Sequence, residues 1–154
     1  MRRIRLKPGA ILELRTSRGL AYLQYVGKHS DFGDVIRVLS GFHKKRPPDL
    51  ETLAVGPGYY TFYAARASAN AGFVEVASTA VPLPGGVGVP DLLRRHGMID
   101  REGNVLNWII ERKGVESVHK TLTESEKELP ILAIWSHDLL VKYVTEEWSP
   151  SQEG

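Results

Sequence analysis

The chain has 154 residues, 42% of them hydrophobic and 25% charged, which is the size and composition of one ordinary globular domain. It contains no cysteine, which excludes disulfide bonds, thiolate metal sites and a cysteine nucleophile. The basic N-terminus is followed by no apolar stretch of signal-peptide length, and no run of about 18 apolar residues occurs, so we expect a cytoplasmic protein without a membrane span.

The first half of the chain is predicted to be rich in β-strands. Apolar and polar residues alternate in five short runs that contain many β-branched and aromatic side chains. Turn-forming residues separate the runs, and Ser17-Arg18-Gly19 between the first two is typical of a hairpin. We therefore expect a mainly antiparallel sheet with strands over residues 11–15, 20–26, 35–39, 59–65 and 73–77.

Two segments interrupt this pattern. The connection from Gly41 to Pro57 contains prolines and the basic sequence Lys44-Lys45-Arg46, and its length indicates an exposed loop. Residues 82–90 are rich in proline and glycine and resemble a linker, but too little periodic sequence lies on either side for two separate cores. We therefore predict one domain over residues 1–148, followed by a frayed tail over residues 149–154.

The second half is predicted to add strands and then two short helices. Residues 105–111 and 116–120 are typical of strands on either side of a Lys-Gly turn. Thr123 to Glu126 has the form of a capping box, and Pro130 must end the helix that begins there. Residues 131–135 indicate a buried segment, and Ser136 is a candidate N-cap for a last helix that extends to about Trp148.

Together these elements predict an α+β fold: a twisted, mainly antiparallel β-sheet with two short C-terminal helices in a single domain. In the last helix, Leu140, Val141, Val144 and Trp148 recur on one side and predict that it packs on the sheet. Trp108 and Trp135 lie in apolar, strand-like runs, so we expect both to be core residues and not binding anchors.

No catalytic constellation is recognisable. The histidines are scattered, without the spacing that makes a metal site specific. Ser136-His137-Asp138 has the residue types of a hydrolase triad, but neighbours at a helix start diverge, and capping explains them with less assumption. The glycines of residues 85–88 lack the Lys-Ser/Thr pair of a phosphate loop. We therefore expect no enzyme activity, no catalytic residues, no metal and no cofactor.

Charge is distributed unevenly along the chain. Residues 1–77 contain 12 Lys and Arg against 6 Asp and Glu, whereas residues 78–154 contain 8 against 12. In the first half, basic residues that include Lys28, Arg37 and Lys44–Arg46 occur near Tyr22, Tyr25 and Phe42. Cations and aromatic rings together can bind single-stranded nucleic acid, so a small β-rich nucleic-acid-binding module is an alternative function.

Both ends of the chain resemble an immunity-protein family of bacterial polymorphic toxin systems. The resemblance lies in Lys7-Pro8-Gly9-Ala10-Ile11-Leu12-Glu13-Leu14 with residues 19–26, and in Trp108-Ile109-Ile110, residues 122–131 and Ile134-Trp135-Ser136-His137. Members of such families are small cytoplasmic proteins that protect a cell by binding a cognate toxin. The resemblance therefore implies a protein partner and no cofactor.

The leading hypothesis is thus a non-enzymatic immunity protein that neutralises a bacterial toxin domain by direct binding. A hydrolase is a third and weaker hypothesis. Inhibitors of basic toxins need negative potential, and the late helical region concentrates it. The candidate partner-binding residues are therefore Glu124, Glu128, Glu146 and Glu147.

Overall fold

The structure is a computed structural model that describes residues 3–153. These residues form two compact units, with residues 3–89 and 134–148 in unit 1 and residues 90–133 and 149–153 in unit 2. The division after Val89 falls at the end of the proline- and glycine-rich stretch. The prediction of one domain over residues 1–148 requires that the two units unfold together.

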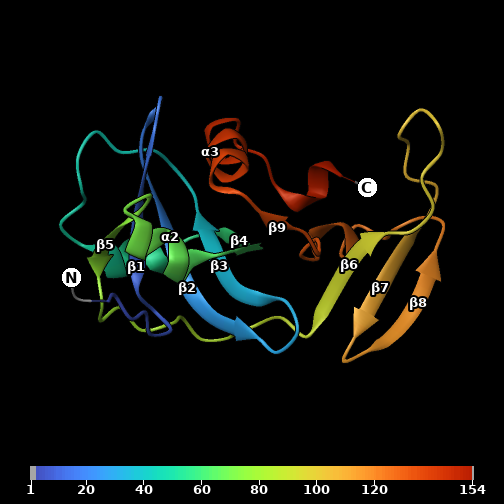
Figure 1. The fold of residues 1–154 in the computed structure, drawn as a ribbon, viewed down its shortest axis with the longest axis horizontal. Coiled ribbons are helices and arrows are strands. Elements are labelled where there is room, and N and C mark those ends of the chain that lie inside the picture. The colour runs from blue at the N-terminus through green and yellow to red at the C-terminus, as the bar shows by residue number, and fades with distance from the viewer. Residues whose placement is uncertain (1–2, 154) are drawn as a thin grey trace. The chain divides into compact units, whose positions relative to one another are not determined.

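The elements of both units are seen in Figure 1. In chain order they are β1 (Ile11–Thr16), β2 (Gly19–His29), β3 (Gly33–Leu39), α1 (Leu50–Ala54), β4 (Gly58–Tyr63), α2 (Ala65–Ala71), β5 (Glu75–Ser78), β6 (Leu92–His96), β7 (Trp108–Arg112), β8 (Val115–His119), the 3₁₀ turn η1 (Glu126–Glu128), β9 (Ile134–Trp135), α3 (His137–Thr145) and the 3₁₀ turn η2 (Pro150–Gln152).

Unit 1 is built on a six-stranded sheet in the order β5-β1-β2-β3-β4-β9. Every pairing is antiparallel except that of β9 with β4. The hairpin predicted at Ser17-Arg18 is present, with Thr16 paired to Gly19. Because successive side chains of a strand point to opposite faces, the nearly continuous burial of β1 to β3 requires cover on both sides of the sheet.

Helices supply that cover on both faces of the sheet. On one face, α2 and α3 bury apolar side chains against the strands, among them Ala65, Ala69, Leu140 and Val144. On the other face, Leu50 and Ala54 of α1 and the later Val81 pack on Ile11 and Tyr22. The predicted stripe of the last helix thus packs on the sheet as expected, and Trp135 is buried with it at 6% exposure.

Unit 2 contains the three-stranded antiparallel sheet β6-β7-β8. Trp108 is 5% exposed, as predicted for a core residue, and the guanidinium of Arg94 lies 4.1 Å over its ring. Arg94 is fully buried, and its Nη2 donates to the carbonyls of Lys127 at 3.0 Å and Pro150 at 2.5 Å. This one side chain therefore joins β6 to the segments of η1 and η2.

The capping bonds predicted at both helix starts of the second half are present, although the first of these helices is only the 3₁₀ turn η1, which begins at Glu126. The backbone N–H of Thr123 donates to Oε1 of Glu126 at 2.8 Å, and the N–H of Glu126 donates to the Thr123 hydroxyl at 3.2 Å. The Ser136 hydroxyl accepts from the N–H of Leu139 at 3.2 Å. These are the reciprocal capping box and the serine N-cap that the sequence predicts.

Several boundaries differ from the sequence expectation. The exposed loop expected after Gly41 contains α1, which Asp49 caps through the N–H of Thr52 at 3.1 Å. The strand expected at residues 59–65 ends at Tyr63, because α2 begins at Ala65. The last helix ends at Thr145 and not at about Trp148.

The tail also differs from the expectation of fraying. Residues 149–153 contain η2, Pro150 is buried, and the carbonyl of Pro150 accepts from the buried Arg94. The fold class itself is confirmed as α+β with a mainly antiparallel sheet, and the helical segments near the C-terminus are η1, α3 and η2. Among residues 3–153, no helix is long and apolar enough to cross a membrane.

Candidate binding surface

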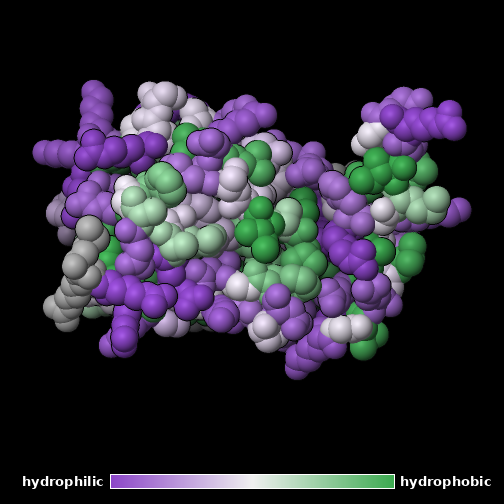
Figure 2. Space-filling view, in the orientation of Figure 1, coloured by the Kyte–Doolittle hydropathy of each residue, from purple (hydrophilic) through white to green (hydrophobic). Residues whose placement is uncertain are grey.

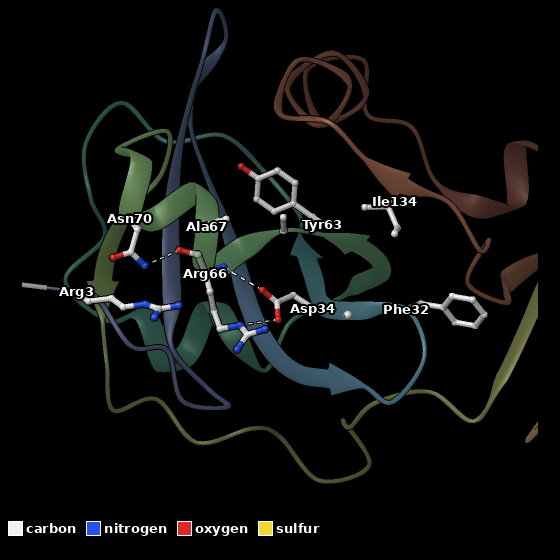
Figure 3. A pocket seen from close by; sticks show the side chains of 10 residues that line it. Arg3, Phe32, Asp34, Tyr63, Arg66, Ala67, Asn70 and Ile134 are labelled. Carbon is white, nitrogen blue, oxygen red and sulfur yellow. Dashed lines mark hydrogen bonds and ion pairs between the residues drawn. The ribbon is translucent and has the colours of Figure 1, made fainter.

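A surface feature of unit 1 that combines charge with apolar walls lies beside α2. It is a cavity of about 610 Å³, shown from close by in Figure 3. Phe32, Tyr63 and Ile134 form its apolar wall, and Arg3, Arg66, Asp34 and Asn70 form its polar side. Ile134 is 63% exposed although it belongs to a strand, so the rim of the cavity presents an apolar side chain to solvent.

Asp34 organises the floor of this cavity. Its carboxylate accepts from the backbone N–H of Arg66 at 3.1 Å and from the Nε of Arg66 at 2.8 Å, and both bonds are drawn in Figure 3. The N-cap residue of α2 is Ala64, which has no side chain that can cap. Asp34, from β3, therefore supplies the negative charge that a helix N-terminus favours.

A buried tyrosine, Tyr25, contacts the carboxylate of Asp34. The Tyr25 hydroxyl donates to Oδ1 of Asp34 at 3.4 Å, and burial, with the charge of Asp34 as a second cause, raises the pKa of Tyr25. Tyr25 is therefore neutral at physiological pH and acts as a hydrogen-bond donor to the carboxylate. The set Tyr25–Asp34–Arg66 fixes α2 on the sheet and leaves the guanidinium of Arg66 half exposed at the cavity.

A second set of side chains lies where α3 begins. The Tyr63 hydroxyl and Nδ1 of His137 are 2.9 Å apart, and the ring of Phe73 stacks on His137 with centroids 4.9 Å apart. Burial raises the pKa of Tyr63. His137 is thus engaged by Tyr63 and Phe73, while Ser136 caps α3 and Asp138 lies in the first turn of that helix.

A second cavity, of about 570 Å³, lies along α2. Arg5, Arg15, Glu13, Glu75 and Phe73 are among its lining residues. Phe73 is 58% exposed, and Gly72, with φ of 82°, ends α2 in the left-handed conformation that turns the chain toward it. We call the surface formed by Arg3, Arg5, Arg15, Arg66, Ala67, Asn70 and Phe73 the α2 face.

The acidic neighbours of the α2 face are already paired. Glu13 accepts from the Nε of Arg46 at 2.8 Å, and Nη2 of Arg46 lies 3.6 Å from Oε1 of Glu75. Asp34 is paired with Arg66. The remaining guanidinium groups therefore give this face a cationic character, and in Figure 2 pale, weakly hydrophobic atoms over α2 are bordered by hydrophilic ones.

The residues that the sequence singled out for partner binding lie elsewhere. Glu124 and Glu128 are exposed in unit 2, where Glu124 lies 3.5 Å from Lys127. Glu146 and Glu147 are exposed at the end of α3 in unit 1, and Glu147 is bonded to Arg18 at 2.6 Å. The four carboxylates are therefore divided between the units, with two in each.

The basic and aromatic residues of the alternative function do not form one surface. Tyr22 and Tyr25 are 1% and 4% exposed, as core packing in alternating strands requires. Arg37 is buried, and its guanidinium donates to the carbonyls of Ala54 and Gly56. Arg46 is held by Glu13, and Lys44 and Lys45 are exposed in the same loop.

Sequence reasoning missed the α2 face because no motif marks it. An available signal was the alanine-rich segment Ala64–Ala71 followed by Gly72, since alanine has the highest helix propensity and glycine ends helices. Within residues 3–153, no three His, Asp or Glu side chains gather in a way that could hold a metal ion. Comparisons with protein-family models, with curated proteins and with solved structures find no match for the chain.

Proposed function

We propose that the chain is a non-enzymatic binding protein that docks a protein partner on the α2 face. The observation that carries this proposal is the composition of the face, where four arginines and an exposed phenylalanine surround a short helix with small outward side chains. Arginine and aromatic residues are enriched at protein interfaces and among the residues that dominate binding energy. The small side chains of α2 allow a partner to approach the helix closely.

The charge of the α2 face indicates which kind of partner surface it can bind. Arg3, Arg5 and Arg15 are exposed, and the acidic side chains that line the same two cavities are paired with Arg46 and Arg66. A partner that presents carboxylates beside apolar side chains complements this arrangement. Such complementarity raises the rate of association, and salt weakens the effect over a Debye length of about 8 Å at physiological ionic strength.

The partner we propose is a bacterial toxin domain, on the strength of the resemblance of both ends of the chain to immunity proteins. An immunity protein acts by covering a surface that the toxin needs, which requires affinity and no chemistry of its own. The buried positions of Tyr22 and Tyr25 favour this function over nucleic-acid binding, because a stacking platform needs exposed rings.

The test is a capture experiment with matched charge variants. The full chain is used to capture its partner from the native organism, and the partner is identified by mass spectrometry and then purified. We expect Arg5→Glu/Arg15→Glu to lower the association rate with that partner about tenfold or more at low salt. Lys44→Glu/Lys45→Glu changes the charge equally and is expected to have little effect.

The same assay tests the acidic residues predicted from the sequence. Glu124→Lys/Glu146→Lys avoids Glu147, whose bond to Arg18 is part of the fold. If this variant slows association while the arginine variant binds like the unchanged chain, the acidic residues form the interface and the α2 face does not. If only Lys44→Glu/Lys45→Glu slows it, or if the captured partner is nucleic acid, the alternative function replaces the proposed one.

A further inference from the structure

The two edges of the unit 2 sheet differ in how they are covered. On the β6 side, the N–H of Arg94 donates to the carbonyl of Pro130 at 3.0 Å, and the N–H of Leu132 donates to the carbonyl of Arg94 at 2.8 Å. In the described part of the chain, β8 pairs with β7 alone, and Figure 1 shows it as the outer strand of the sheet. An open strand edge is a template for pairing with another chain.

The turn between β7 and β8 determines which backbone groups of β8 are free to pair. Lys113 and Gly114 have φ of 49° and 83°, and Arg112 is the partner of Val115, so the turn is a two-residue turn of type I′. The residues that flank such a turn form a hydrogen-bonded pair. Because hydrogen-bonded and non-bonded pairs alternate along an antiparallel ladder, Glu116 and Val118 direct their N–H and C=O groups away from β7.

The same strand exposes apolar side chains. Val118 is 68% exposed and Val115 is 75% exposed, and Figure 2 shows hydrophobic atoms over this outer side of the sheet. Val118 lies opposite Ile109 of β7, so the two form an apolar pair on one face. Glu116 precedes Val118 by two residues and lies on the same face of β8, because side chains alternate along a strand. Lys120 is exposed and is the first residue after β8, where the chain bends.

Charge selects one register for pairing β8 with another β8. An antiparallel two-fold centred on Glu116 or on Lys120 would place like charges opposite each other, which is destabilising. Centring on Ser117 or His119 places each of these charges opposite an uncharged residue. Centring on Val118 pairs Val118 with itself and places Glu116 of each copy opposite Lys120 of the other.

We propose that the chain associates with a second copy through β8, in an antiparallel two-fold pairing centred on Val118. The two three-stranded sheets then form one continuous sheet of six strands. Each Glu116, held by Arg95 through Oε1 at 2.8 Å, meets Lys120 of the second copy with its other oxygen. Val118 and Ile109 of both copies form a continuous apolar strip across the junction. This association is independent of the α2 face.

The test is sedimentation equilibrium of the full chain from micromolar to millimolar concentration, with single charge reversals. Glu116→Lys and Lys120→Glu each convert both opposite-charge pairs into like-charge pairs, and we expect either to raise the dimer Kd about tenfold or more. An equimolar mixture of the two variants restores opposite charges at both positions, so we expect a heterodimer of near-original affinity. Glu102→Lys and Arg101→Glu, on the exposed 97–107 loop, are the matched controls and are expected to dimerise normally.

Amide hydrogen exchange supplies a second readout that does not depend on a substitution. We expect the N–H groups of Glu116 and Val118 to become protected as concentration rises, whereas the N–H of Ser117, directed to β7, is protected at every concentration. A chain that stays monomeric throughout the range overturns the proposal. So does a dimer that both charge reversals leave unchanged, or one whose charge-swapped mixture does not recover.

Discussion

Glu13 is an acidic side chain in the interior, only 6% exposed. Its Oε2 accepts from the Tyr22 hydroxyl and from the Nε of Arg46, each at 2.8 Å. The hydrogen bond from Arg46 outweighs the opposing effect of burial and holds the pKa of Glu13 below its ordinary value of 4.5. Burial and the bond to Glu13 raise the pKa of Tyr22 to about 12. The carboxylate is therefore bound as an anion in the folded chain.

Glu13→Gln is expected to lower the free energy of unfolding by about 1–3 kcal/mol at neutral pH, because a hydrogen-bonded charge is lost from a buried site. A lowered folded-state pKa stabilises the fold above pH 4.5, and this stabilisation is lost as pH falls through the folded value. The difference in the free energy of unfolding between Glu13→Gln and the unchanged chain, measured by urea denaturation, should therefore become smaller below that pH. Glu51→Gln, at an exposed residue of α1, is the control. Equal denaturation curves for both variants and the unchanged chain would contradict the assignment of Glu13 as an anion that stabilises the fold.

Trp135 and Trp108 test the packing of the two units one at a time. Each is nearly fully buried, Trp135 against Tyr143 and Trp148 with ring centroids 5.0 and 5.1 Å away, and Trp108 beneath Arg94. Alanine at either position should destabilise the fold by about 3–5 kcal/mol, measured by chemical denaturation. A variant that keeps its stability but no longer binds the partner would make that tryptophan a binding anchor.

At the scale of elements, cap signals were the most reliable part of the sequence. Ser136 and the Thr123–Glu126 box act locally, between residues three apart, and the structure contains both caps as predicted. The Lys113-Gly114 turn is equally local and lies between the two strands expected around it. Interactions confined to one turn of chain can be recognised from sequence because tertiary structure adds little to them.

The elements that sequence reasoning missed depend on distant residues. Helix α2 is only seven residues long, and its cap is Asp34 of β3, at a separation of 32 residues from Arg66. Strand β6 contains Leu-Leu-Arg-Arg-His, without β-branched or aromatic residues, and its central Arg94 is buried because three carbonyls from later segments accept from it. Neither the cap of α2 nor the carbonyl groups that accept from Arg94 can be recognised from a local sequence pattern.

The dependence of α2 on Asp34 is testable. Asp34→Ala removes both the cap of α2 and the charge partner of Arg66, so we expect a loss of about 1–3 kcal/mol and faster amide exchange across Ala65–Ala71. Asp34→Asn keeps a cap acceptor without the charge and should lie between the alanine variant and the unchanged chain. Unaltered exchange in α2 of the alanine variant would show that the helix stands without this carboxylate.

At the scale of the whole molecule, the candidate site was the part least accessible from sequence. Charge along the chain correctly marks the first half as cationic, and Arg3, Arg5, Arg15 and Arg66 all belong to it. Their convergence beside α2 could not be inferred, because it requires the N-terminal segment to lie along a helix that was itself not predicted. Asn70 makes that contact, bonding both the N–H and the carbonyl of Ile4.

The single-domain prediction is tested by a chain that ends at Pro130. This chain lacks α3, which supplies Leu140 and Val144 to the core of unit 1, and η2, whose Pro150 accepts from Arg94 in unit 2. We expect it to lose the thermal transition and the amide protection of both units. If it retains the transition and protection of the full chain, the C-terminal segment is not part of one cooperative structure.

We propose that the chain acts on its partner by binding alone. The most direct measurement is a titration of the purified toxin domain with the full chain, followed by toxin activity and by the intact mass of the toxin. We expect inhibition to be complete at a fixed stoichiometric ratio, to be independent of incubation time after binding, and to reverse when the complex is dissociated, with the toxin mass unchanged. If an amount of the chain far below that stoichiometric ratio abolishes toxin activity, and the mass of the toxin changes, the chain modifies the toxin as an enzyme and does not act by binding alone.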